Sequence, residues 1–260
     1  MKKLILLLPL ILTSCGSAEH EWAWYILSPN KVNGLTNLKF LLSGMGLTIY
    51  ISVISIIISM FLGFVVAIPS LAKNKFLTYI NIGYVEIVRA IPLLVLILWV
   101  YYGLPIMTGL SFSPFVSGII ALAISESAFQ AEIFRAGINS IKKSQWEAGS
   151  SLGLAFYKRL RLVILPQAIK NILPALGNQF VYVLKMSSLV SIIGIADLTR
   201  KANELVTTTY RPLEIYTFLI LEYLILISIC SLFNISIRAI GTPYWITSWA
   251  VLTAESKSGK

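Results

Sequence analysis

The residues of this 260-residue chain that are best able to do chemistry are a few polar and charged side chains within long apolar segments. Glu126 and Gln130 are four positions apart, so a helix would place them on one face. Lys185, Ser187 and Ser188 add an ammonium group and two hydroxyl groups to a later apolar segment. If these segments cross a bilayer, an ionised group at its centre costs at least about 2.5 kcal/mol unless it is paired or wetted. We therefore expect each charge to have a partner or a function.

The charges of Glu126 and Lys185 allow two interpretations. In the first, Glu126 and Gln130 line a solute pathway, and the carboxylate favours a cationic substrate such as arginine or lysine. Lys185, Ser187 and Ser188 would then receive the carboxylate of the substrate or complete a buried hydrogen-bond network. In the second, Glu126 and Lys185 pair across two helices and are purely structural.

A charged, helix-forming stretch from Lys142 to Pro166 interrupts the apolar sequence. Within it, Glu147 can pair with a cation on a partner protein. Ala148, Gly149 and Gly153 have almost no side chain, so a partner surface can approach the backbone closely. The alternative is an ordinary connecting helix that is ended by its glycines and has a solvated basic face. The basic residues of that face are Lys158, Arg159 and Arg161.

Composition excludes an ordinary soluble domain, because 57% of the residues are hydrophobic, 12% are charged and the mean hydropathy is +0.82. A helix needs about 20 apolar residues to cross the hydrocarbon core. The sequence therefore predicts an all-α membrane protein with about five transmembrane helices. The expected spans are Leu41 to Pro69, about Ala90 to Leu104 extended backwards by YVEIVR, Phe115 to about Ile138, about Ile172 to Ile195, and about Leu213 to Ile237.

Basic residues predict the orientation of the chain, because Lys and Arg are retained in short loops on the cytoplasmic side. Running the first span inwards places the N-terminus outside and the C-terminus in the cytoplasm, together with most Lys and Arg residues and the charged 142–166 stretch. The formal net charge is +10, and much of this basic excess then lies in loops that face the cytoplasm and anionic lipid. We expect no nucleic acid partner, because no nucleic-acid-binding module is present.

The first residues are consistent with an outside N-terminus. Two lysines precede an apolar run from Leu4 to Leu12, and Ser14-Cys15-Gly16 follows, which resembles a bacterial lipoprotein signal peptide. An uncleaved signal-anchor or a chance match is the alternative. We therefore divide the chain into a signal peptide (1–15), an extracytoplasmic segment (16–40), a transmembrane domain (41–238) and a cytoplasmic tail (239–260).

Missing motifs exclude several classes of function. One histidine and two remote cysteines argue against a metal site, a disulfide framework and a membrane-embedded enzyme. The chain lacks the glycine-rich loop ending in Lys-Ser/Thr that holds a triphosphate, so we do not expect it to hydrolyse ATP. Only about 25 residues separate Cys15 from the first span, far fewer than the roughly 100 of a substrate-binding domain. An ion-coupled secondary carrier is the alternative function, although inverted repeats are missing.

A short sequence repeat occurs near the ends of two of the expected spans. Glu86–Ala90 (EIVRA) resembles Glu132–Ala136 (EIFRA), and an acid and a base three positions apart on a helix can form a local pair. We expect these pairs to lock helices to the charged stretch. Pro92 is expected to kink the second span, and Glu222 in the last span is assigned no chemistry.

Four segments between Gly44 and Tyr223 resemble the permeases of polar amino acid ABC importers, the histidine and glutamine type. They are GMGLTIYISVISIIISMFLGFVVAIPSLAKN, YVEIVRAIPLLVLILWVYYGLP, AFQAEIFRAGINSIKKSQWEAGSSLGL and LPQAIKNILPALGNQFVYVLKMSSLVSIIGIADLT. The spacing from Glu147 through Gly153 to Leu165-Pro166 resembles the EAA motif of these proteins. In that family the motif forms a short cytoplasmic coupling helix that sits in a groove of the ATPase subunit.

The resemblance implies a type I importer fold, multi-pass in the bacterial cytoplasmic (inner) membrane. It implies an intertwined dimer with a second permease copy or paralogue, an ATPase dimer that holds ATP and Mg, an extracytoplasmic solute-binding protein and an amino acid substrate. No cofactor is then expected on this chain. Two positions depart from the family: Ser144 replaces a usual glycine before Gln145, and Met186-Ser187 replaces an Asp-Thr pair. The second departure weakens any inference of the substrate.

Overall fold

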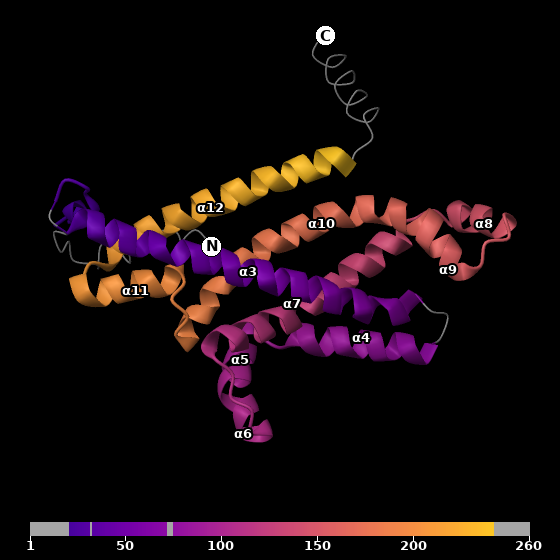
Figure 1. Cartoon of the computed structure of the whole chain (residues 1–260), viewed down its shortest axis with the longest axis horizontal. Helices are drawn as coiled ribbons and strands as arrows, with labels where there is room; N and C mark the ends of the chain where they lie inside the picture. Colours follow the sequence, from indigo (N-terminus) through magenta and orange to yellow (C-terminus); the bar gives the residue numbers. More distant parts are fainter. Residues whose placement is uncertain (1–20, 32, 72–74, 242–260) are drawn as a thin grey trace, which may run out of the picture.

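The computed structural model describes residues 21–31, 33–71 and 75–241, and its regular elements are all helical (Figure 1). The all-α prediction is therefore confirmed. The α-helices are α3 (Gly34–Leu71), α4 (Lys75–Ala90), α5 (Leu93–Leu98), α6 (Leu104–Thr108), α7 (Pro114–Asn139), α8 (Lys143–Ser151), α9 (Phe156–Arg159), α10 (Leu165–Met186), α11 (Leu198–Thr209) and α12 (Pro212–Gly241). Short 3₁₀ segments are η1 (Trp24–Leu27) and η4 (Ser187–Ile193), and π segments are η2 (Trp99–Gly103) and η3 (Leu160–Ile164).

Four helical stretches of the described chain are long and apolar enough to cross a membrane. A bent pair, Phe76–Ala90 with Leu93–Thr108, makes a fifth candidate. The expected count of about five thus agrees with the structure if the bent pair is one span. The four single stretches are Gly34–Pro69, Pro114–Asn139, Phe156–Ile193 and Pro212–Leu232.

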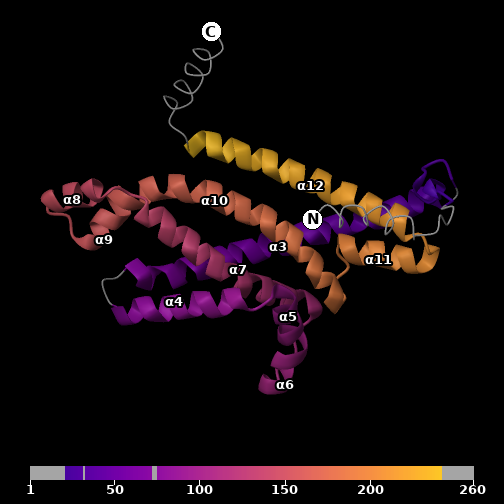
Figure 2. The same cartoon turned by 180° about the vertical axis from the view of Figure 1, so that it is seen from behind.

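The expected second span is broken rather than kinked. Its two halves meet at an angle of 93°, and Pro92 stands at the N-terminal end of α5. Proline has no backbone N–H and disfavours a helical conformation of the preceding residue, here Ile91. Figure 1 and Figure 2 both show α6 projecting from the bundle, whereas α5 packs against α7. The sequence located the bend at Pro92 but underestimated its size.

Helix α7 is the centre of the bundle. Of its most apolar stretch, 67% is buried, against 17% for α12 on the outside. Gly63 allows α3 to approach it closely, since a Cβ there would lie 2.4 Å from the Cβ of Gln130 and 2.8 Å from the carbonyl oxygen of Ser127. The facing side of α3 carries buried hydroxyl groups at Thr48, Ser52, Ser55 and Ser59.

The two ends of the bundle are built differently (Figures 1 and 2). Helices α8 and α9 extend from one end. At the other, α11 and the beginnings of α3 and α12 lie together under an N-terminal strap, residues Glu21–Leu27. The backbone N–H of Ala23 donates to Glu214 at 2.8 Å, and Arg211 donates to the carbonyl of Glu21 at 2.9 Å. These bonds fasten the strap to the start of α12.

The expected division of the chain stays a prediction, but the start of the first long helix is known. The helix that contains the first span begins at Gly34, seven residues before Leu41, because polar residues such as Asn37 and Lys39 continue the helix beyond its apolar part. The suggested signal peptide and most of the suggested tail lie outside the described residues.

Candidate functional site

The charged stretch forms a helical hairpin, residues 142–159, which contains α8 and α9. We call it the coupling hairpin after the role that the family resemblance implies. The side chain of Glu147 is 63% exposed and lies 3.3 Å from the ammonium group of Lys143. Ala148 is also exposed. Because exposed surface pairs of this kind are worth less than about 1 kcal/mol, Glu147 is free to exchange Lys143 for a partner cation.

The two glycines of the hairpin have different structural roles. Gly149 is buried, and a Cβ there would lie 2.9 Å from Cγ and Cδ of Arg159. Gly153 has φ +70° with open space around it, and it ends α8 in a Schellman motif. In that motif the N–H of Leu154 donates to the carbonyl of Gly149 at 3.2 Å, and the N–H of Gly153 donates to that of Ser150 at 2.9 Å. Gly153 thus ends the helix, as the alternative interpretation expected.

The basic residues after the turn do not form one solvated face. Lys158 and Arg161 are exposed, but the guanidinium carbon of Arg159 lies 5.6 Å from the ring centre of Trp146. Sequence reasoning missed this contact, because the two residues are thirteen positions apart and belong to different helices.

The predicted pathway residues of α7 lie in the interior of the bundle. Glu126 is 1% exposed and Gln130 is fully buried, one helical turn apart. The carboxylate of Glu126 accepts a hydrogen bond from the side-chain amide of Gln179 on α10. Within the described chain, the side chain of Gln130 has no hydrogen-bond partner. The partner of Glu126 is therefore Gln179, which sequence reasoning had not selected.

The pathway residues at the end of α10 are separate from this pair. Lys185 is exposed, and among the described residues it forms no ion pair with Glu126. The hydroxyl of buried Ser187 donates to the carbonyl of Leu184 at 2.8 Å, and that of half-buried Ser188 donates to the carbonyl of Lys185 at 2.8 Å. The cross-helix pair that the structural interpretation required is thus not formed in this conformation.

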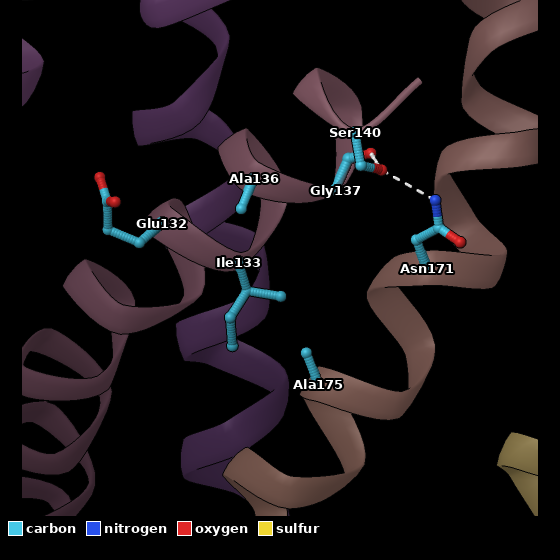
Figure 3. A pocket seen from close by; sticks show the side chains of 7 residues that line it. All are labelled: Glu132, Ile133, Ala136, Gly137, Ser140, Asn171 and Ala175. Carbon is cyan, nitrogen blue, oxygen red and sulfur yellow. Dashed lines mark hydrogen bonds between the residues drawn. The ribbon is translucent and has the colours of Figure 1, made fainter. Parts of the chain in front are cut away.

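A cavity of about 460 Å³ lies between α7 and α10, close to the hairpin (Figure 3). At one rim the side-chain amide of Asn171 donates to the hydroxyl of Ser140 at 2.8 Å. At the other, Glu132 accepts two hydrogen bonds from Arg135, at 2.6 and 3.0 Å, which confirms this local pair. The cavity lining is Glu132, Ile133, Ala136, Gly137, Ser140, Asn171 and Ala175.

In the other copy of the short repeat, Glu86–Ala90, the guanidinium carbon of Arg89 instead lies 4.9 Å from the ring centre of Phe129.

A buried acid also lies at the opposite end of the molecule. Asp197 accepts a hydrogen bond from the backbone N–H of Arg200 at 2.8 Å and so caps the start of α11. Its burial raises the pKa of Asp197 to about 6. The sequence contains the signal for this role, an Asp immediately before an amphipathic helix, but we did not select it.

Comparison with known proteins decides the family. Residues 55–242 match the family described as "Binding-protein-dependent transport system inner membrane component". This chain belongs to that family. The permease is a multi-pass protein of the bacterial inner membrane and the transmembrane subunit of an ABC importer, which excludes the secondary carrier. The matched range includes the coupling hairpin and the residues predicted to line the pathway, but not the N-terminal strap.

Individual relatives agree with this assignment. The permease is 35% identical to the arginine transport system permease protein ArtQ of Bacillus subtilis over 75% of this chain and 89% of the relative. It is 32% identical to the glutamine transport system permease protein GlnP of Escherichia coli, with the same coverage. A crystal structure of an amino acid ABC transporter with histidines superposes with a TM-score of 0.75, at 36% identity, over 82% of this chain and 99% of that one.

The fold is shared more widely than the sequence. An inward-facing methionine ABC transporter, MetNI, aligns with a TM-score of 0.69 at only 18% identity, over 79% of this chain and 98% of that chain. This likeness shows that the helical arrangement of the permease is that of ABC importers.

Proposed function

We propose that this permease carries polar amino acids into the cell, driven by ATP hydrolysis on a separate ATPase subunit. The observation that carries the proposal is the coupling hairpin, which extends from one end of the bundle and exposes Glu147 and Ala148 for a partner. The permease itself is then not an enzyme, and ATP and Mg are held by the partner. The names of its relatives, which transport arginine and glutamine, support an amino acid substrate.

The hairpin end of the bundle faces the cytoplasm in this proposal. Lys142, Lys143, Lys158 and Arg161 are all exposed at that end, which is the distribution that the positive-inside rule favours. An extracytoplasmic solute-binding protein would then deliver its amino acid at the α11 end. An ATPase dimer would bind at the hairpins of two permeases, this chain and a second copy or paralogue.

The substrate pathway is proposed to pass the polar interior of α7. Glu126 and Gln130 share a face there, and Gln179 joins them from α10. Lys185 and the neighbouring serines would lie nearer the outer end of the pathway. The cavity of Figure 3, farther along α7, would open beside the hairpin on the cytoplasmic side.

Uptake into proteoliposomes tests the proposal. The vesicles contain this permease, its cognate ATPase and its binding protein, and they are offered a mixture of all common amino acids. We expect one or a few polar amino acids to accumulate when ATP and Mg are present on the side of the membrane where the ATPase is bound. We expect no accumulation when ATP is replaced by a non-hydrolysable analogue. Accumulation that follows an ion gradient without ATP would contradict the proposal.

A further inference from the structure

Arg159 is partly buried in the coupling hairpin, whereas the nearby basic residues Lys158 and Arg161 are exposed. It is the last residue of α9, and its side chain extends across the hairpin to α8. We propose that Arg159 is a positioning residue that holds the coupling helix α8 on the transmembrane helix behind it. This inference rests on the proposed function of the hairpin as the contact with the ATPase.

Three contacts fix the side chain of Arg159 against α8. Its guanidinium group lies over the ring of Trp146, with 5.6 Å between the guanidinium carbon and the ring centre. Its Nη1 donates a hydrogen bond to the backbone carbonyl of Trp146 at 3.3 Å. Its methylene groups fill the space beside Gly149, where a Cβ would lie 2.9 Å from Cγ and Cδ. The missing side chain of Gly149 is therefore explained by Arg159 rather than by a partner protein.

Trp146 connects this contact to the body of the permease. Its ring stacks on Phe156, with 6.0 Å between ring centres and 21° between planes. Trp146 also packs against the buried cluster that joins α7 to α10, which includes Ile138 and Ile164. A second link supports the first, since Gln167 donates to Gln145 at 3.2 Å.

The backbone helix that contains Arg159 continues without a break as a candidate membrane span. α9, η3, α10 and η4 form one uninterrupted helical stretch, Phe156–Ile193. A push on α8 can therefore reach that stretch through the Arg159 side chain as well as through the loop of the hairpin. Without Arg159, α8 keeps its Schellman turn and the bond between Gln167 and Gln145, but it loses the contact that covers Trp146 and Gly149.

Charge alone does not explain the contact. Lys158 and Arg161 carry the same charge, yet both are exposed. A planar guanidinium group can stack on an indole ring and donate to a carbonyl at the same time, whereas a lysine ammonium group acts as a point charge. We therefore expect lysine at position 159 to be a poor substitute, and Arg161 is the matched control.

The experiment measures amino acid accumulated per ATP hydrolysed in proteoliposomes that contain the full permease with its ATPase and binding protein. We expect Arg159→Ala to lower this ratio about tenfold while the complex still assembles and hydrolyses ATP, because the variant loses a cation–π contact and a hydrogen bond. Arg159→Lys should recover only part of the ratio, and Arg161→Ala should stay near wild type. An unchanged ratio in Arg159→Ala would overturn the inference.

A spectroscopic readout separates this inference from the proposed function. In full-length permease whose other tryptophans are replaced by phenylalanine, Arg159→Ala should shift the emission of Trp146 to the red and increase its quenching by acrylamide. Unchanged emission and quenching would show that Arg159 does not cover Trp146, and would overturn the inference even if uptake is normal in wild type. A wild-type complex without any ATP-driven uptake would instead overturn the proposed function, and the coupling role with it.

Discussion

Gly63 in the bundle and Gly149 in the coupling hairpin are both buried, but they face different kinds of neighbour. Gly63 lies against the backbone and Cβ atoms of α7. A Cβ added at Gly63 would lie 2.9 Å from the backbone nitrogen of Ala131. Gly149 lies against the flexible side chain of Arg159. Backbone atoms of a packed helix cannot move aside, whereas a long side chain can change rotamer. The contact of α3 with α7 in the bundle is therefore the rigid part of the permease in this comparison. The contact of Gly149 with Arg159 in the hairpin is the adjustable part.

The most damaging change we expect is in the rigid part. Gly63→Ala should force α3 and α7 apart, at a cost of about 3 kcal/mol, because an overpacked contact with backbone has no room to relax. Thermal unfolding of the purified permease in detergent measures this. Gly46→Ala is the matched control on the same helix, since nothing lies within 4 Å of a Cβ there. Equal stability of the two variants would mean that the α3–α7 contact is not rigid.

A change in the turn of the hairpin tests the adjustable part. We expect Gly153→Asp to abolish ATP-driven uptake while the permease still inserts, because it adds bulk and negative charge beside Glu147 at the proposed ATPase contact. Aspartate is among the side chains that tolerate a positive φ best, so folding should suffer little.

Gly109→Asp is the control for this variant, because Gly109 has φ +72° and open surroundings but ends α6, far along the chain from the hairpin. Normal uptake by Gly153→Asp would remove the coupling role from this turn. Charge reversal in Glu147→Lys should likewise reduce uptake without affecting insertion.

The interior of α7 offers a finer test of the comparison. If the pathway passes Glu126, then Glu126→Gln should lower uptake of arginine or lysine about tenfold relative to neutral amino acids, because a carboxylate attracts a cationic side chain. Competition uptake assays measure the ratio. Glu86→Gln, an exposed acid on α4 away from this interior, is the control. An equal loss for all substrates would make Glu126 a structural residue of the rigid bundle.

The smallest effect is expected where α3 meets α11. At this contact Gly44 faces the backbone of Asp197, and a Cβ added at Gly44 would lie 2.7 Å from the carbonyl group of Asp197. Burial raises the pKa of Asp197 to about 6, above the roughly 4 of an unfolded chain, so the folded permease binds more protons between these values and loses stability as the pH rises through them.

Asp197→Asn keeps the cap of α11 and removes this pH dependence. We expect the variant to be more stable than wild type by about 1 kcal/mol at pH 7 and less stable than wild type by about 1 kcal/mol near pH 4, since the unpaired amide N–H costs about 1.5 kcal/mol at both pH values. Unfolding curves at several pH values measure the difference. A wild type whose stability is flat between pH 4 and 6 would contradict the prediction.

Much of the fold could be predicted because apolar runs and Pro92 act locally. The helical character of the charged stretch at α8 and α9 could likewise be predicted, since its sequence signals are local. The sequence could not predict contacts between distant helices, such as that between Glu126 and Gln179, because one helical pattern allows many packings. The same limit concealed Arg159, whose role depends on which helix Trp146 faces.

The N-terminal strap bears on how the permease is made. Its residues Glu21 and Ala23 leave the ribosome early, but their partners Arg211 and Glu214 follow 190 and 191 positions later. At a synthesis rate of about 5–20 residues per second, the strap has to wait roughly 10–40 seconds for the start of α12. This end of the bundle can therefore close only after α12 has begun to emerge.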